Sequence, residues 1–196
     1  MKKDLILLAH LTAKSIVLVL FIPLIFSSCN SSHENRETGT STRSELDLLT
    51  ENAWKNSGDW VQRVTLSPKG IVRNVIWGVP IDSLNEKLDL AENQPANGKS
   101  YTLYFDQSDL NFTDITYIKD RQGKLSEIDF DIFVETKPQV NDLKEKLTTY
   151  LKVKFGASKI NGKKIIWEKD KNTQVVLDDV STAKDPGIKL VFLKIN

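Results

Sequence analysis

Histidine and cysteine are nearly absent: the chain of 196 residues has two histidines and one cysteine, all within the first 43 residues. The single cysteine, Cys29, excludes a disulfide within the chain. Because no imidazole or thiol lies beyond residue 43, the remaining chain cannot use Ser-His-Asp or Cys-His catalysis. A zinc site built on those ligands is excluded for the same reason.

Other chemistries lack their sequence signals as well. Neither a glycine-rich dinucleotide motif nor a Walker motif occurs. The 27 Lys+Arg nearly balance the 26 Asp+Glu, and no basic run lies outside the first three residues, so the basic footprint of nucleic-acid binding is missing. We therefore predict a protein that is not an enzyme, needs no cofactor or metal and binds no nucleic acid.

The N-terminal segment has the three parts of an export signal. Lys2 and Lys3 give a positive start, an apolar run covers residues 16–26, and two serines precede Cys29. The apolar run is too short to span a bilayer, which takes about 20 residues.

The sequence Phe-Ser-Ser-Cys at residues 26–29 resembles the lipobox of bacterial lipoproteins, although Phe26 replaces the usual leucine. The resemblance implies cleavage before Cys29, acyl chains such as palmitate on that residue, and a place in the cell envelope. We expect the outer membrane, with the domain in the periplasm or at the cell surface. Several acyl chains hold a protein firmly, whereas one gives marginal binding. The alternative, an uncleaved anchor over residues 5–26, would bury Lys14 at considerable cost.

These assignments divide the chain into a signal peptide (1–28), a disordered tether (29–43) and a single domain (44–196). Residues 30–43 include no apolar side chain, so they cannot bury enough surface to become ordered. The domain has the size of an ordinary globular domain and can bury about 70% of its unfolded surface without a metal or a disulfide.

Hydrophobic periodicity and turn residues predict the elements of the domain. Helices are expected over residues 44–54, 82–90 and 136–155, the last opened by a capping box from Thr136 to Gln139 and ended by Gly156. Strands are expected over residues 60–66, 71–77, 101–106, 113–119, 125–135, 164–168, 174–178 and 188–195. The first two strands could form a hairpin, and tight turns are expected at residues 120–123 and 161–162.

The order helix–strand–strand–strand occurs twice, at about residues 75–135 and 136–196, which suggests an internal repeat. Strands joined by short turns pair antiparallel, and helices with one apolar stripe cover one face of the sheet. We therefore predict an α+β fold, with an antiparallel sheet covered on one face by helices.

Trp77, Gly78 and Pro80 form a Trp-Gly-x-Pro entry to the first repeat. With the order of elements, this entry resembles the tandem fold of beta-lactamase inhibitor protein and of the small lipoprotein of the outer-membrane barrel-assembly machinery. Those families bind partners through surfaces and not through a fixed motif. The resemblance therefore implies a protein-binding module, and it transfers no functional residue to this chain.

Three acids, Glu127, Asp129 and Asp131, alternate with apolar residues and so share one face of a predicted strand. They are the candidate partner-binding residues, suited to a basic partner or a cation, or to a pair of glycosidase carboxylates. The simpler interpretation is a solvated face balanced by lysines on neighbouring strands, because like charges about 7 Å apart on a strand repel only mildly.

Further polar and aromatic residues are assigned structural roles. Two acidic groups are expected to be polar loops in preference to calcium sites, namely Asp106, Asp109, Asn111 and Asp114, and Asp178, Asp179 and Asp185. Of the tryptophans, Trp77 and Trp167 are expected in the core, while Trp54 and Trp60 are left undecided.

Three functions follow as hypotheses. The first is a non-enzymatic envelope module that binds a protein, in assembly or inhibition, and it predicts an exposed apolar or aromatic patch on the uncovered sheet face. The second is binding of a peptide, glycan or lipid in a closed pocket between sheet and helices. The third is a hydrolase with two carboxylates about 5 to 9.5 Å apart in a cleft.

Overall fold

The computed structural model describes residues 44–170 and 172–195, which have an α+β fold. The helical elements are α1 (Glu45–Lys55), α2 (Asp59–Thr65), a 3₁₀ turn η1 (Ile81–Ser83) and α3 (Lys137–Phe155). The strands are β1 (Asp89–Leu90), β2 (Gly98–Tyr104), β3 (Phe112–Lys119), β4 (Leu125–Phe133), β5 (Ser158–Asn161), β6 (Lys164–Lys169), β7 (Thr173–Asp179) and β8 (Gly187–Lys194).

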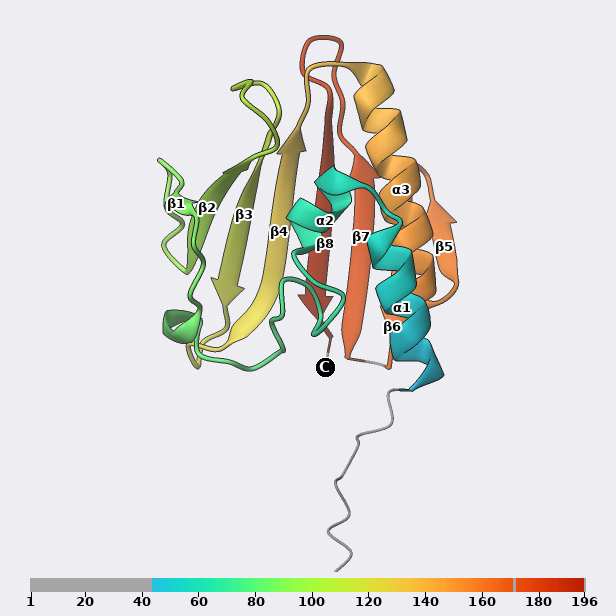
Figure 1. The fold of residues 1–196 in the computed structure, drawn as a ribbon. Helices are drawn as coiled ribbons and strands as arrows, with labels where there is room; N and C mark the ends of the chain where they lie inside the picture. The colour runs from blue at the N-terminus through green and yellow to red at the C-terminus, as the bar shows by residue number, and fades with distance from the viewer. Residues whose placement is uncertain (1–43, 171, 196) are drawn as a thin grey trace, which may run out of the picture. The chain divides into compact units, whose positions relative to one another are not determined.

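Over the described residues the strands form one sheet of eight, in the order β1-β2-β3-β4-β8-β7-β6-β5. Every neighbouring pair is antiparallel, and β4 and β8 join the two halves. Figure 1 shows α1, α2 and α3 on the same side of the sheet, and the segment between α2 and β1 runs on that side too. The prediction of an antiparallel sheet with helices on one face is therefore confirmed.

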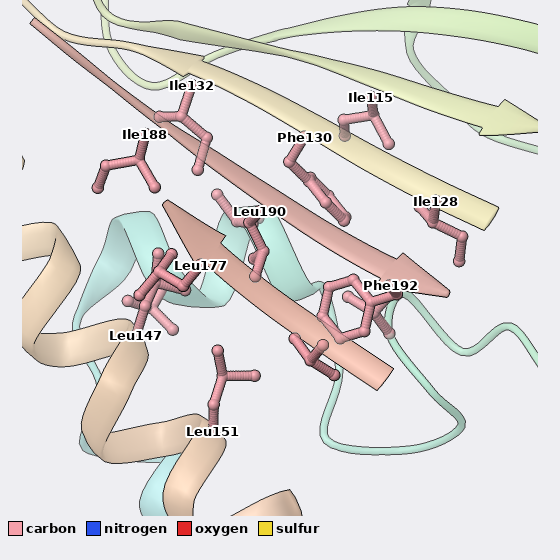
Figure 2. Close-up of a cluster of buried hydrophobic side chains, with 14 of the residues drawn as sticks. Ile115, Ile128, Phe130, Ile132, Leu147, Leu151, Leu177, Ile188, Leu190 and Phe192 are labelled. Carbon is pink, nitrogen blue, oxygen red and sulfur yellow. The ribbon is translucent and has the colours of Figure 1, made fainter. Parts of the chain in front are cut away.

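The core lies between this helical layer and the sheet. Figure 2 shows side chains from β4, β7 and β8 pointing toward Leu147 and Leu151 of α3. The helix is amphipathic, and its stripe of Val140, Leu143, Leu147, Tyr150, Leu151 and Phe155 is buried as its spacing predicts. The capping box at Thr136 and Gln139 opens α3 and Gly156 caps its end, as predicted.

The strand predicted over residues 60–66 is wrong, because Asp59–Thr65 forms the helix α2. The buried residues Val61, Val64 and Thr65 are spaced at i, i+3 and i+4, which is a helical interval. Packing of that stripe outweighs the β propensity of its branched residues. The predicted partner strand at residues 71–77 is also wrong, since that segment consists of turns and irregular backbone.

The helix predicted over residues 82–90 is reduced to the short turn η1, so this prediction is wrong as well. The apolar residues that suggested it still meet the core: Ile81 is buried, and Leu84 and Leu88 pack against the core. The chain then leaves the helical conformation at Leu84 and pairs with β2 at residues 89–90. Burial of these residues does not require a helix.

The internal repeat is not confirmed in its predicted form. Each half of the sheet has four strands where three were expected, because β1 and β5 were missed. The first half is preceded by a 3₁₀ turn and the second by the 19-residue helix α3.

The tryptophans belong to the packing of the domain. Trp167 is buried in the core, and Trp77 packs against the core while its indole nitrogen donates to Thr173 at 2.9 Å. Trp54 and Trp60 also pack against the core. The expectation of a core position is confirmed for Trp167, whereas Trp77 is partly buried at the edge of the core and lies in a turn and not in a strand.

Candidate functional site: the uncovered sheet face

The candidate site is the sheet face opposite the helical layer. Along β4 the residues Ile128, Phe130 and Ile132 are buried under the helices, and the residues between them point to the opposite face. Glu127, Asp129 and Asp131 alternate with these buried residues, so the sequence correctly places the three acids together on one face. Within the described residues, the helices of Figure 1 leave that face uncovered.

The central charges of this face form a row across the strands. Asp131 lies opposite Asp114 of β3 on one side and opposite Lys189 of β8 on the other. The Lys189 amine contacts Asp131 at 3.1 Å and Asp129 at 3.2 Å. Because Lys189 faces both acids, the simpler prediction of lysines balancing the acidic strand is met at these two positions. Burial alone would lower the pKa of Lys189, but the two carboxylates outweigh it and raise the pKa.

Glu127 behaves differently from its two neighbours. Partial burial, followed by the charge of Asp129 and a hydrogen bond with it, raises the pKa of Glu127 to about 7, and Lys189 offsets only part of this. One buried oxygen of Asp129, Oδ1, has no hydrogen-bond partner among the described residues. Protonation of Glu127 relieves its repulsion with the charge of Asp129, which is why the pKa of Glu127 is raised and not lowered.

An aromatic cluster, formed by Tyr104, Phe112 and Phe133, lies at one end of the same face. The three residues are consecutive cross-strand partners on β2, β3 and β4. The rings of Phe112 and Phe133 stack with centroids 5.0 Å apart, and the rings of Tyr104 and Phe112 are 5.9 Å apart. Tyr104 and Phe133 remain 47% and 38% exposed, so the cluster presents apolar surface to solvent.

Two hollows border this aromatic cluster. One of about 450 Å³ lies between β1 and the cluster, and Leu90, Thr102 and Asp114 contribute to its lining. The other, of about 260 Å³, lies on the far side of Phe112 and is lined in part by Leu110 and Pro186. The first is partly acidic and the second mainly apolar. The aromatic cluster therefore forms a ridge between two depressions.

The remaining acidic groups have structural roles. Asp106 accepts hydrogen bonds from the backbone of Ser108 and from the side chain of Asn111, which closes the β2–β3 turn. Burial would raise the pKa of Asp179, but hydrogen bonds from Lys137 and Ser181 lower it well below its usual range. No group of residues suited to a metal ion occurs in the described part of the chain.

Cys29, the predicted lipidation site, lies outside the described residues. Among residues 44–170 and 172–195, no helix is long and apolar enough to cross a membrane.

Sequence reasoning missed the aromatic cluster. Its signal was present, since Phe112 directly precedes the predicted strand 113–119 and shares the strand periodicity of Asp114 and Thr116. The register that brings it against Tyr104 and Phe133 comes only from the tertiary structure.

Comparison with known proteins gives no relative for this arrangement. No protein-family model, no curated protein and no solved structure matches the chain.

Proposed function

We propose that this protein is a non-enzymatic lipoprotein of the bacterial envelope, anchored through acyl chains on Cys29, and that its uncovered sheet face binds a protein partner. The anchor is supported by the positive start, the short apolar run and the Phe-Ser-Ser-Cys sequence at residues 26–29. The expected membrane is the outer membrane.

The observation that carries the binding proposal is the aromatic cluster beside the acidic row. Exposed aromatic side chains anchor many protein interfaces because they bury a large area with few rotatable bonds. Tyr104 and Phe133 meet this description, and both rings contact Phe112, Phe133 by stacking and Tyr104 in a tilted arrangement. The ridge between two hollows also gives this face a shape that a partner can complement.

The charges beside the ridge support a partner with a basic residue. Next to the ridge, Asp114 and Asp131 lie directly opposite each other on β3 and β4. Lys189 offsets the charge of Asp131, while Asp114 accepts a hydrogen bond from Thr102. A partner segment with an apolar side chain followed by a Lys or Arg would cover the aromatic cluster and place its charge beside Asp114.

The carboxylate-hydrolase hypothesis receives less support from this geometry. Glu127, Asp129 and Asp131 lie on an open sheet face, and none of them lines the hollows described above. Two of the three are engaged by Lys189.

Site-specific photo-crosslinking in cells producing the full lipidated chain tests the proposal. A photoreactive residue at Tyr104 or Phe133 should yield one discrete crosslinked protein, and mass spectrometry should locate the crosslink in a segment with apolar and basic residues. The matched control is Leu48 on α1, which has the same exposure as Tyr104 to within one per cent. Equal crosslinking at Leu48, or none at either sheet position, would reject the sheet face as the binding surface.

The anchor has its own test. The native chain should incorporate labelled palmitate and lose residues 1–28, whereas the Cys29→Ala chain should incorporate none. If the native chain incorporates no palmitate and retains residues 5–26, the uncleaved anchor replaces the lipoprotein assignment.

A further inference from the structure

A separate cavity lies on the helical side of the sheet, away from the aromatic cluster and its two hollows. It has a volume of about 380 Å³, and residues of α1, the loop after α2, the end of α3 and the end of β6 line it. The loop contributes Pro68, Lys69 and Gly70 to the wall, and two further lysines, Lys154 and Lys169, complete it. Three lysines around one small cavity are the first sign of an anion site.

Lys154 is unusual because lysine side chains are ordinarily charged and exposed, whereas this residue is only 6% exposed. Its amine donates one hydrogen bond, to the carbonyl oxygen of Pro68 at 3.0 Å. Burial, and secondly the charge of Lys169, lower the pKa of Lys154 to about 7. Besides that carbonyl oxygen, the amine lies near the rings of Tyr150 and Phe155, and none of these partners has a full negative charge. A negatively charged group in the cavity would therefore stabilise the ammonium form.

Lys169 is a second lysine that lines the same cavity. The amines of Lys154 and Lys169 lie 5.7 Å and 5.6 Å from the ring centroid of Phe155. The Lys169 amine donates to the carbonyl oxygen of Lys154 at 2.9 Å. None of the ion pairs among the described residues includes either lysine. Each ammonium therefore retains N–H groups that these contacts do not use.

Two acids also line the cavity, and their positions decide its net charge. Glu51 is 2.8 Å from Lys55, which offsets its charge, and Asp47 is exposed in the first turn of α1. With Lys69 counted, the three lysines exceed the two acids. A small anion could contact the amines of Lys154 and Lys169 without approaching these two carboxylates. A larger anion would be repelled by them.

We propose that this cavity binds a small oxyanion, such as inorganic phosphate or a short carboxylate, between the amines of Lys154 and Lys169. The anion would accept hydrogen bonds from both amines and offset the cost of placing two like charges around one aromatic ring. This site is separate from the uncovered sheet face and does not depend on a protein partner.

The competing explanation is purely structural. Lysines near the end of a helix interact favourably with its last carbonyl groups, and Lys169 does so with α3 while Lys154 holds the loop at Pro68. Under this explanation, removing either lysine would change stability but no anion would bind.

The test is a titration of the full-length chain in mild detergent with phosphate at constant ionic strength, with chloride replaced as phosphate is added. Lysine labelled with ¹³C at Cε gives one NMR signal for each lysine side chain. The signal that disappears in Lys154→Met is assigned to Lys154. We expect a saturable shift of the Lys154 signal and a rise in its pKa. Lys154→Met and Lys169→Met should each weaken binding at least tenfold, whereas Lys152→Met, an exposed position on the same helix, should leave it unchanged.

A second titration with acetate separates the two ligand chemistries. Tighter binding of phosphate or of acetate supports the site in either case and names its preferred anion. If Lys154→Met does not fold, Lys169→Met, at a less buried position, provides the same comparison. Non-saturable shifts, or phosphate binding that survives in Lys169→Met, would overturn the proposal.

Discussion

Arg73 and Glu86 form a bidentate ion pair inside the segment that joins α2 to β1. The Nε and Nη2 atoms of Arg73 donate to the two carboxylate oxygens of Glu86, each at 2.8 Å. The two side chains are only 3% and 9% exposed. Tyr117 of β3 also donates to Glu86, and Arg73 donates to the carbonyl oxygens of Arg63 and Val64 in α2. The pair therefore connects the helical layer, the connecting segment and the sheet.

Glu86→Gln is expected to destabilise the domain by about 3 to 5 kcal/mol, because it leaves the buried charge of Arg73 without a partner. Burial alone would raise the pKa of Glu86, but hydrogen bonds from Arg73 and Tyr117 lower it, so the carboxylate is charged in the folded state. Urea unfolding followed by tryptophan fluorescence measures the change. Glu92→Gln, at an exposed position, is the matched control.

Replacing both partners of the pair should cost less than replacing one. In Arg73→Met combined with Glu86→Leu, no unpaired charge remains buried, although Tyr117 loses its acceptor. A double variant that is less stable than Glu86→Gln would show that the network as a whole, and not the charge balance, holds the segment.

Lys154 is expected to make stability increase with pH between about 7 and 10.5. Its pKa is about 7 in the folded chain against an ordinary value of 10.5, so the unfolded chain binds the extra proton in this range. Each unit of difference corresponds to about 1.4 kcal/mol, which allows a change of a few kcal/mol at most. Urea midpoints measured at several pH values should show a steeper rise for the native chain than for Lys154→Met, because other lysines and tyrosines titrate equally in both. Parallel curves would refute a lowered pKa.

Glu127 should produce the opposite trend at lower pH. Its pKa is raised from 4.5 to about 7, so the folded chain holds a proton that the unfolded chain has released in this range. The stabilisation is fully present below about pH 4.5 and disappears as pH rises through 7. Glu127→Gln should remove this component of the pH dependence, and NMR titration of the Glu127 carboxyl carbon checks the pKa directly. A titration midpoint near 4.5 would contradict the raised pKa of Glu127.

The capping box of α3 offers a local test of stability. The Thr136 hydroxyl accepts from the backbone of Gln139, and the Gln139 side chain accepts from the backbone of Thr136 at 2.8 Å. Thr136→Ala should therefore cost about 1 kcal/mol in free energy of unfolding. Thr136→Ser retains the acceptor and should lose only a small part of that amount. Equal losses for Ala and Ser would point to the lost methyl group and not to the cap.

The sequence by itself determined the elements whose signals are local. The capping box, the stripe of apolar residues and Gly156 define α3, because each acts within a few residues of the helix. Alternation of apolar and polar residues defines β3 and β4, and for the same reason it places Glu127, Asp129 and Asp131 on one face. Residue composition likewise determined which catalytic groups are missing beyond residue 43.

Only the tertiary structure decided the segment from residue 59 to residue 90. Val61 and Val64 fit a strand by propensity, yet they are buried as one helical stripe because α2 packs in the helical layer. Glu86 could have continued a helix, but its carboxylate is bound by Arg73 and Tyr117, and the following residues pair with β2. The aromatic cluster and the cavity at Lys154 join residues distant in the chain. Local periodicity contains no information about such contacts, since strand register and the packing of layers determine them.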